Sequence, residues 1–451
     1  MLLQFIVENF RCFAEETLFS MVASAALEQH KSHLIQLTPE THLLRTSVLY
    51  GANAHGKTKL IEAIGFAKQL IVNGIQGTKS IPVEPFRLDK RLRTQPSRFE
   101  FIISYQNIRY HYGFLINHQR VLEEWLFVTP KKREVRYFER VTSETGKVTI
   151  EIGGSLARQN SKQRQFLEFV AQGTRPNQLF LTEALERNVE KLKPLYEWFE
   201  EILQVVPATP RYLPLEIRAN QEKPFMTYLS EFLKQADTGI HSIKTVEEHF
   251  DYDKHFPGLP EQIRLAIEND IRSGATILML GEATSYTLCA NESGEPVLIR
   301  LETIHRGHDG SIVSFDFSKE SAGTQRLTHL LPILVDLLSS EKVYLIDELD
   351  RSLHALLPQF FLEAYLTGVS KTHRSQLIFT THDTHLLDLN LLRQDEIWFL
   401  EKDEHGASQL YSLVNLKMNP DLNIQTGYLQ GRFGGIPFVG DLEQLGMPCK
   451  E

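Results

Sequence analysis

The chain is poor in cysteine and has no long apolar run. Its 451 residues include three cysteines, Cys12, Cys289 and Cys449, which lie far apart and lack the spacing of metal ligands. They offer no disulfide framework, which fits a reducing cytoplasm. No segment approaches the roughly 18 apolar residues of a membrane span, and residues 1–10 lack the basic flank of a signal peptide. We therefore expect a cytoplasmic protein with no membrane partner.

Periodic patterns are also missing. No heptad repeat persists, so a long coiled coil is not expected, and there is no internal repeat or low-complexity tract. The composition, 42% hydrophobic and 23% charged, is that of a globular protein large enough for more than one subdomain. A net charge of -9 excludes a surface that attracts nucleic acid everywhere. A local basic groove for DNA remains open.

A phosphate-binding pattern is present near the N-terminus. Residues 51–58, Gly-Ala-Asn-Ala-His-Gly-Lys-Thr, match the motif G-x-x-x-x-G-K-[ST]. Residues 47–50 predict an apolar strand before the motif, and residues 57–70 predict a helix after it. Strand, loop and helix in this order are the context that a genuine phosphate loop requires.

Each type of residue in this loop has an expected task. Glycines let backbone N–H groups converge on phosphate oxygens at the start of a helix. We therefore expect Asn53 and Gly56 to belong to a nucleotide-binding loop for ATP. Lys57 is expected to reach the β- and γ-phosphates, and the Thr58 hydroxyl is expected to bind Mg²⁺.

Two adjacent carboxylates follow an apolar run in the last third of the chain. Residues 343–346, Val-Tyr-Leu-Ile, predict a strand that leads into Asp347 and Glu348. A carboxylate at a strand end can enter the shell of Mg²⁺, and its neighbour, which points elsewhere, can orient the attacking water. We expect Asp347 to bind the metal and Glu348 to be the catalytic base. The alternative is a surface turn that carries two acids.

Two further positions in the last third can contact anions. His382 follows a predicted strand, 376–381, where a histidine can meet a γ-phosphate oxygen. Ser321 and Gly323 stand at the start of a predicted helix, 323–338, and form a second anion cradle. A structural histidine and a plain helix N-cap are the alternatives, and the residues alone leave both open.

The two halves of the ATP chemistry lie in the outer thirds of the chain. Residues 1–130 are expected to form an N-terminal ATPase lobe with a β-rich section, and residues 311–451 a C-terminal ATPase lobe. Residues 131–310 are expected to form a mainly helical inserted subdomain. Together these segments predict an α/β fold, a P-loop ATPase head split by a β-rich and helical insertion.

The order of these motifs resembles ABC-type ATPases of the Rad50, structural-maintenance-of-chromosomes and RecF kind. The resemblance implies that residues 7–11, Val-Glu-Asn-Phe-Arg, form an N-terminal strand from which Arg11 reaches the nucleotide. It implies that residues 321–324 are the signature motif, which faces the ATP of a second head, so that two heads sandwich two ATPs. Residues 350–354 stand at the D-loop, where His354 replaces the usual acid. The Q-loop glutamine stays open between Gln76, Gln95 and Gln106.

Four other stretches resemble, more narrowly, stand-alone ATPases of bacterial antiphage and abortive-infection systems. This group includes the RloA and AbiL type, the ATPase subunit of the PARIS system and relatives of the ATPase half of the overcoming-lysogenization-defect nucleases. The resemblance implies an oligomeric ATPase that senses infection, with a phage protein as a candidate trigger, and that holds or releases an effector nuclease or toxin. The stretches are 85–88, 175–181, 236–240 and 427–438.

Two alternatives remain at this stage. The chain could be a repair ATPase of RecF or Rad50 type whose closed dimer grips DNA, although its net charge and the missing coiled coil count against this. The glycine-rich tail at 427–438 could dock an effector, or it could be a turn that packs on its own domain.

Overall fold

The computed structural model describes the chain apart from residues 209–214, 256, 281–284, 292, 417–422 and 437–451. It divides into two compact units. The first comprises Met1–Ala208, Asp336–Leu349 and Leu362–Glu451, and the second comprises Thr209–Val335 and Asp350–Phe361. The division passes through helices α9 (Ala322–Ser339) and α10 (Leu356–Gly368).

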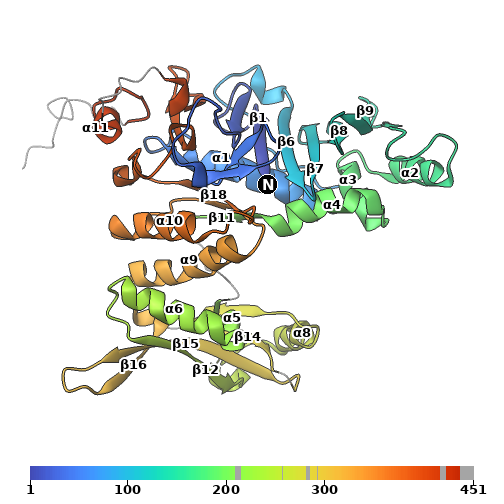
Figure 1. The fold of residues 1–451 in the computed structure, drawn as a ribbon. Helices are drawn as coiled ribbons and strands as arrows, with labels where there is room; N and C mark the ends of the chain where they lie inside the picture. The colour runs from blue at the N-terminus through green and yellow to red at the C-terminus, as the bar shows by residue number, and fades with distance from the viewer. Residues whose placement is uncertain (209–214, 256, 281–284, 292, 417–422, 437–451) are drawn as a thin grey trace, which may run out of the picture. The chain divides into compact units, whose positions relative to one another are not determined.

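A seven-stranded antiparallel sheet forms one part of the first unit, in the order β10-β9-β8-β7-β6-β1-β2 (Figure 1). Its alternating apolar residues, such as Phe99, Phe101 and Ile103, are buried on one face. Gln106 and Asn107, both with positive φ, make the two-residue turn between β6 and β7. The strands are β1 (Leu2–Glu8), β2 (Thr17–Ser20), β6 (Ser97–Tyr105), β7 (Ile108–Ile116), β8 (Val121–Thr129), β9 (Val135–Thr142) and β10 (Val148–Ile152).

The second sheet of the first unit has the order β11-β17-β18-β5-β19-β20. All neighbours are parallel except β19 and β20. Strands β5, β17 and β18 are buried along their whole length, which explains their continuous apolar runs. Their carboxyl ends meet at one edge, where open α/β sheets bind ligands. The strands are β5 (Thr46–Tyr50), β11 (Leu203–Val206), β17 (Val343–Ile346), β18 (Gln376–Thr380), β19 (Ile397–Lys402) and β20 (Ser408–Ser412).

Helices and short strands complete the first unit. Helix α1 (Lys57–Asn73) follows β5 and buries one apolar face, as its sequence predicts. None of the described helices combines the length and the apolar character needed to cross a lipid bilayer. The other elements of this unit are β3 (Leu34–Gln36), β4 (His42–Leu44), α2 (Lys162–Gly173), α3 (Phe180–Glu186), α4 (Lys193–Glu197) and α11 (Ile424–Leu429).

A buried ion pair anchors α3 to the seven-stranded sheet. The side chains of Arg140 and Glu124 are fully buried, with Nη1 and Oε2 3.3 Å apart. Glu124 also accepts the first two backbone N–H groups of α3, at 2.6 and 2.9 Å, and Arg140 donates to the Gln178 carbonyl at 2.8 Å. Stretch 175–181, one of the four that resemble defence ATPases, is thus a structural anchor in this chain.

Removing one partner of this pair should destabilise the fold strongly. Arg140→Leu leaves the Glu124 carboxylate buried without its cation, so we expect the free energy of unfolding to fall by about 3–5 kcal/mol. Chemical denaturation measures this change. Arg136→Leu on the same strand is the matched control, because Arg136 pairs with its carboxylates at the exposed surface and should have only a small effect. Equal losses in the two variants would contradict the assignment.

The second unit has its own five-stranded sheet. Four of its strands follow the order β12-β15-β14-β13, and the fifth strand, β16, pairs with β15. Its pairs are all antiparallel. Its strands are β12 (Ser242–His249), β13 (Ile277–Leu280), β14 (Ser285–Ala290), β15 (Pro296–Arg306) and β16 (Ile312–Asp316). Its helices are α5 (Leu215–Gln221), α6 (Lys223–Gln235), α7 (Tyr252–His255) and α8 (Glu261–Arg272), with the first parts of α9 and α10.

The structure differs from the expected helical insertion at 131–310. Residues 135–152 form β9 and β10 of the first unit's sheet, and the second unit contains a sheet as well as helices. Strand β12 carries Lys244, Glu247 and Glu248 and buries few side chains. Because a polar strand of this kind lacks clear apolar alternation, its pairing with β15 is a tertiary effect that the local sequence does not show.

Candidate functional site

The phosphate loop connects β5 to α1 and is packed too tightly for side chains at two of its glycines. A Cβ on Gly51 would lie 2.6 Å from the Leu400 carbonyl oxygen. A Cβ on Gly56, whose φ is +109°, would lie 2.7 Å from Ser408 Oγ and 3.1 Å from Cys12 Sγ. Both positions therefore require glycine. Asn53, at the outer side of the loop, is exposed.

The Lys57 ammonium is bound to the backbone at the start of this loop. Its Nζ donates to the carbonyl oxygens of Gly51 at 2.6 Å and Ala52 at 3.2 Å, and the residue is only 6% exposed. The ammonium group is therefore fixed beside the backbone that begins the loop. A tightly packed glycine loop beside a fixed ammonium group is suited to bind the phosphates of a nucleotide.

Thr58 and Asp347 meet although they lie far apart in the sequence. The Thr58 hydroxyl donates to Asp347 Oδ1 at 3.2 Å, and Asp347 is only 3% exposed. A hydroxyl and a carboxylate are hard oxygen ligands of the type that Mg²⁺ takes together with substrate phosphates. Within the described residues there is no cluster of three or more His, Cys, Asp or Glu side chains that could hold a metal without such help.

Glu348 adopts an unusual backbone conformation beside Asp347. Its φ is +48°, in the left-handed region that costs a non-glycine residue on the order of 1–3 kcal/mol. The Thr380 hydroxyl binds the side chain of Asp347 and the backbone of Glu348. It donates to Asp347 Oδ1 at 2.6 Å and accepts a hydrogen bond from the Glu348 backbone N–H at 2.7 Å. Sequence reasoning missed Thr380; its only signal is its position at the strand end, two residues before His382.

His382 belongs to the same edge of the sheet. It is exposed and follows β18, the parallel neighbour of both β17 and β5. The Thr381 backbone N–H donates to the Leu49 carbonyl at 3.2 Å, and the Tyr50 hydroxyl donates to the Asp383 carbonyl at 3.0 Å. The structure thus brings the His382 segment, Asp347–Glu348 and the phosphate loop to one edge.

Arg11 lies beside α1 and pairs with carboxylates. Its guanidinium pairs with Glu62 of α1 and, at 3.5 Å, with Glu84. Its φ is +52°, and its neighbour Cys12 packs against the phosphate loop at Gly56. Contact between Arg11 and a nucleotide stays a prediction.

Ser321 and Gly323 belong to the second unit, where they begin α9. The Ser321 hydroxyl accepts the Thr324 backbone N–H at 3.1 Å, which is the geometry of a helix N-cap. A Cβ on Gly323 would lie 2.6 Å from the carbonyl oxygen of Ser352, in the expected D-loop. A pocket of about 660 Å³ opens at this place, and His354 is among its lining residues. The N-cap interpretation is therefore confirmed, and the anion cradle remains compatible with it.

Residues 47–388 match the family described as "AAA domain, putative AbiEii toxin, Type IV TA system". The chain belongs to this family. As a member of this AAA domain family, it is an ATPase of AAA type, in which nucleotide binding with Mg²⁺ is typical. The predicted class, an α/β P-loop ATPase without a long coiled coil, is confirmed for the described residues. Arg11 and the glycine-rich tail lie outside the matched residues.

Comparison with solved structures pairs the chain with heads of SMC proteins. The SMC head domain from Thermotoga maritima is 10% identical, with 92% of this chain and 99% of that chain covered and a TM-score of 0.36. The SMC head bound to the C-winged helix domain of ScpA is 11% identical, with 91% and 97% covered and a TM-score of 0.38. The SMC head with an extended coiled coil, bound to the C-terminal domain of ScpA derived from Pyrococcus furiosus, is 12% identical, with 96% and 98% covered and a TM-score of 0.31. No curated protein matches the chain by sequence.

Proposed function

We propose that this AAA-family chain is the ATP-binding and ATP-hydrolysing subunit of a bacterial antiphage defence system. Its heads assemble when they bind ATP, sense infection, and hold or release a separately encoded effector, a nuclease or a toxin. The observation that carries the proposal is the meeting of Lys57, Thr58 and Asp347 at one sheet edge. The family description, which names a toxin and a toxin–antitoxin system, supports an effector of this kind.

In the proposed function, each site residue of the first unit has its own role in binding or hydrolysing ATP. With ATP bound, Lys57 and the backbone of the phosphate loop would hold the phosphates, and Thr58 and Asp347 would hold Mg²⁺, which would neutralise phosphate charge. Glu348 would accept a proton from the water that attacks the γ-phosphorus, and His382 would contact a γ-phosphate oxygen. The bond between the γ-phosphorus and the β,γ-bridging oxygen would break, and ADP would leave. The Thr380 hydroxyl holds the Asp347 carboxylate and the backbone of Glu348.

We infer self-assembly from the place of the proposed signature motif. Ser321 and Gly323 begin a long helix whose N-terminus favours an anion, and a pocket opens in front of them within the second unit. In our proposal this cradle receives the γ-phosphate of an ATP bound to another copy. A homodimer, or a higher oligomer built from such pairs, then contains composite ATP sites.

A native pull-down tests this function. The Glu348→Gln variant is expressed from its own operon and purified with ATP, and the masses of the complexes are determined. We expect a complex of several copies that retains a neighbouring gene product, and we expect Lys57→Ala, treated identically, to lose it. Recovery of a lone chain with ATP, or of the same complex with Lys57→Ala, would contradict the proposal.

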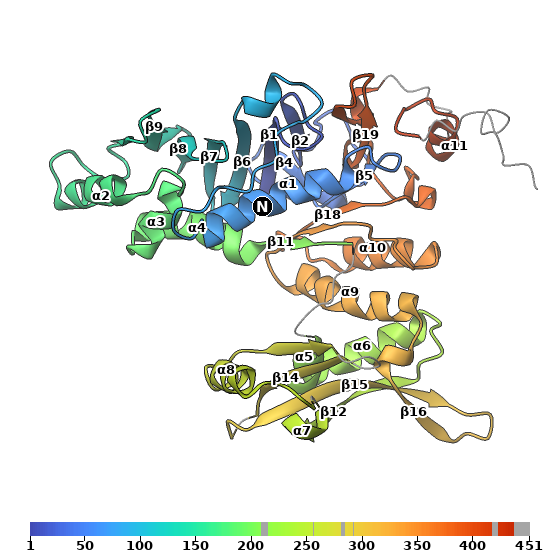
Figure 2. The same ribbon diagram turned by 180° about the vertical axis from the view of Figure 1, so that it is seen from behind.

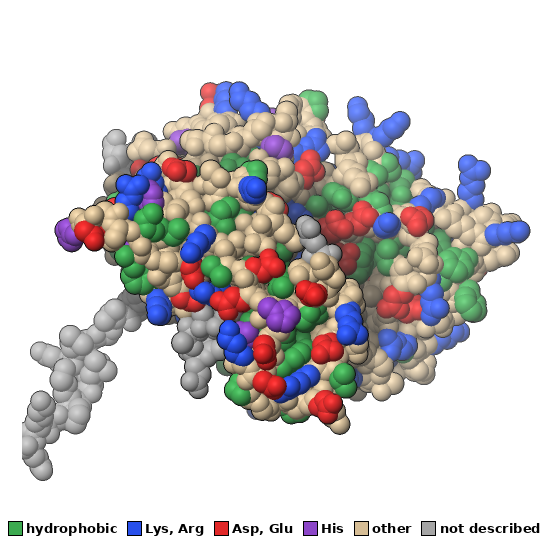
Figure 3. Space-filling model, turned by 90° about the horizontal axis from the view of Figure 1, so that it is seen from below, with side chains coloured by type: hydrophobic (Ala, Val, Ile, Leu, Met, Phe, Trp, Pro, Cys, Tyr) green, Lys and Arg blue, Asp and Glu red, His purple; other side chains and the backbone are tan. Residues whose placement is uncertain are grey.

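The DNA-clamping alternative lacks support on the face of the molecule drawn in Figure 3. Acidic and basic side chains are interspersed there, with no broad field of one sign. A duplex needs a continuous row of cations along its phosphates. A lone dimer that retains DNA in the same pull-down, in a way that salt disrupts, would favour this alternative.

A further inference from the structure

The C-terminal segment 423–436 packs on the strands that carry the phosphate loop. The Asn423 side chain caps α11, and Tyr428 on this helix is only 7% exposed. The Tyr428 ring stacks on Phe399 of β19, with ring centroids 5.5 Å apart and planes at 20°, and it lies 5.7 Å from Tyr50 at the end of β5. Figure 2 shows α11 beside the β5–β19 side of the sheet.

Two glycines bring this segment into direct contact with the start of the phosphate loop. Gly435 has a φ of +67°, and a Cβ there would lie 3.5 Å from Gly51 Cα and 3.3 Å from the Leu400 carbonyl oxygen. Gly51 itself has no room for a Cβ over that same oxygen. The backbone of Gly435 therefore packs against that of Gly51 beside Leu400 of β19, and its positive φ favours glycine.

The Tyr428 hydroxyl holds Gly435 in this position. It donates to the Gly435 carbonyl at 3.0 Å. Burial raises the pKa of Tyr428 to about 12, so the hydroxyl keeps the proton that it donates at pH 7. Gly51, on which Gly435 packs, also accepts a hydrogen bond from the Lys57 ammonium through its carbonyl oxygen at 2.6 Å.

The same segment also reaches the loop that follows His382. Gln425 Nε2 donates to Thr384 Oγ1 at 3.3 Å. Thr384 begins a short 3-10 helix two residues after His382. The segment therefore contacts both loops that, in the proposed function, meet the phosphates.

We propose that residues 423–436 form a brace for the nucleotide site, and that Tyr428 is a positioning residue, which acts through Gly435 and Gly51 on Lys57. The inference rests on the proposed ATP site and adds a component from the C-terminal segment, outside the residues that match the family. Tyr428 itself touches no phosphate; its hydroxyl fixes Gly435, which packs on the Gly51 backbone that binds the Lys57 ammonium.

Tyr428→Phe tests the brace in the full-length protein, because it removes the hydroxyl and keeps the ring. We expect the Kd and KM for ATP to rise about three- to tenfold, as the loss of a hydrogen bond of ordinary strength predicts. The value of kcat and the melting temperature without nucleotide should change little. Gly435→Ala should weaken ATP binding in the same direction. Leu429→Ala is the matched control, since Leu429 lies on the same helix and is 61% exposed.

The outcomes separate the brace from the ATP site itself. If the wild type binds ATP, Lys57→Ala does not, and Tyr428→Phe binds as the wild type does, the brace is refuted and the ATP site stands. If Tyr428→Phe loses affinity only as far as its melting temperature falls, and Leu429→Ala does the same, the role of Tyr428 is structural and the inference fails. A wild type that does not bind ATP would refute the proposed function first.

Discussion

Lys57→Ala is expected to remove ATP binding. Hydrogen bonds to charged groups contribute about 1.5–3 kcal/mol each, and 1.4 kcal/mol corresponds to tenfold in affinity. Loss of the contacts from one ammonium to two phosphates should therefore weaken binding by roughly 100-fold or more. The variant also leaves the carbonyls of Gly51 and Ala52 without their cation, so the loop loses its fixed form. Isothermal titration with ATP and Mg²⁺ measures the effect.

The chain offers a close control for this variant. Lys59 lies in the first turn of the same helix, is 45% exposed and pairs with Glu62 at 2.8 Å. Lys59→Ala removes the same charge from almost the same place without touching the loop, so its affinity for ATP should stay near that of the wild type. If the two variants bind ATP equally well, Lys57 does not bind phosphate.

Glu348→Gln is expected to retain ATP and to lose hydrolysis. A positioned general base contributes about 10²- to 10⁴-fold to the rate, and an amide cannot accept the proton of the attacking water. The bond from the Glu348 backbone to Thr380 does not involve the side chain, so the local fold should persist. Steady-state phosphate release and ATP binding, measured on one preparation, give the two quantities.

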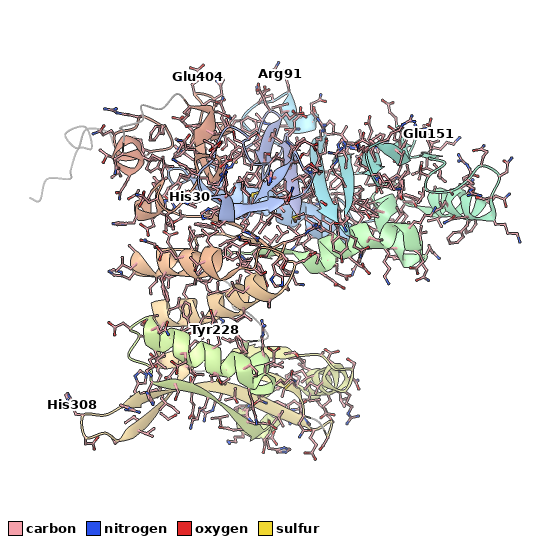
Figure 4. The ribbon with its side chains drawn as sticks, viewed as in Figure 1. His30, Arg91, Glu151, Tyr228, His308 and Glu404 are labelled. Atoms are coloured by element: carbon pink, nitrogen blue, oxygen red, sulfur yellow. The ribbon has the colours of Figure 1, made fainter. Side chains whose placement is uncertain are left out.

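Glu404→Gln is the control for this experiment, because it removes the same charge as Glu348→Gln. Glu404 is 85% exposed at the turn between β19 and β20, and its side chain points outward (Figure 4). Its hydrolysis rate should equal that of the wild type. A wild-type rate in Glu348→Gln would mean that another group orients the water.

The local parts of the site could be predicted from the sequence. The phosphate loop is a continuous motif whose glycines and lysine have fixed tasks, and Asp347–Glu348 end an apolar strand. Both signals lie within a few residues, so no tertiary information is needed. The structure then brings Thr58 to Asp347, because β18 pairs in parallel with both β5 and β17.

The parts that depend on distant contacts could not be predicted. Thr380 and Tyr428 belong to no motif, and their roles arise from hydrogen bonds to Asp347, Glu348 and Gly435. The sequence allowed the tail to be an effector dock or a turn; its described part, up to residue 436, packs on its own unit, and residues 437–438 lie outside the described residues. The Q-loop glutamine, which is Gln76, Gln95 or Gln106, stays a prediction.

In the proposed function, ATP drives assembly through sites that two copies share. Light scattering with size-exclusion chromatography measures this on the full-length Glu348→Gln chain, with and without ATP and Mg²⁺. We expect ATP to convert the protein to a dimer or a higher multiple, and we expect Lys57→Ala introduced into the same chain to prevent this. A mass that does not change when the protein is saturated with ATP would mean that ATP does not join the copies.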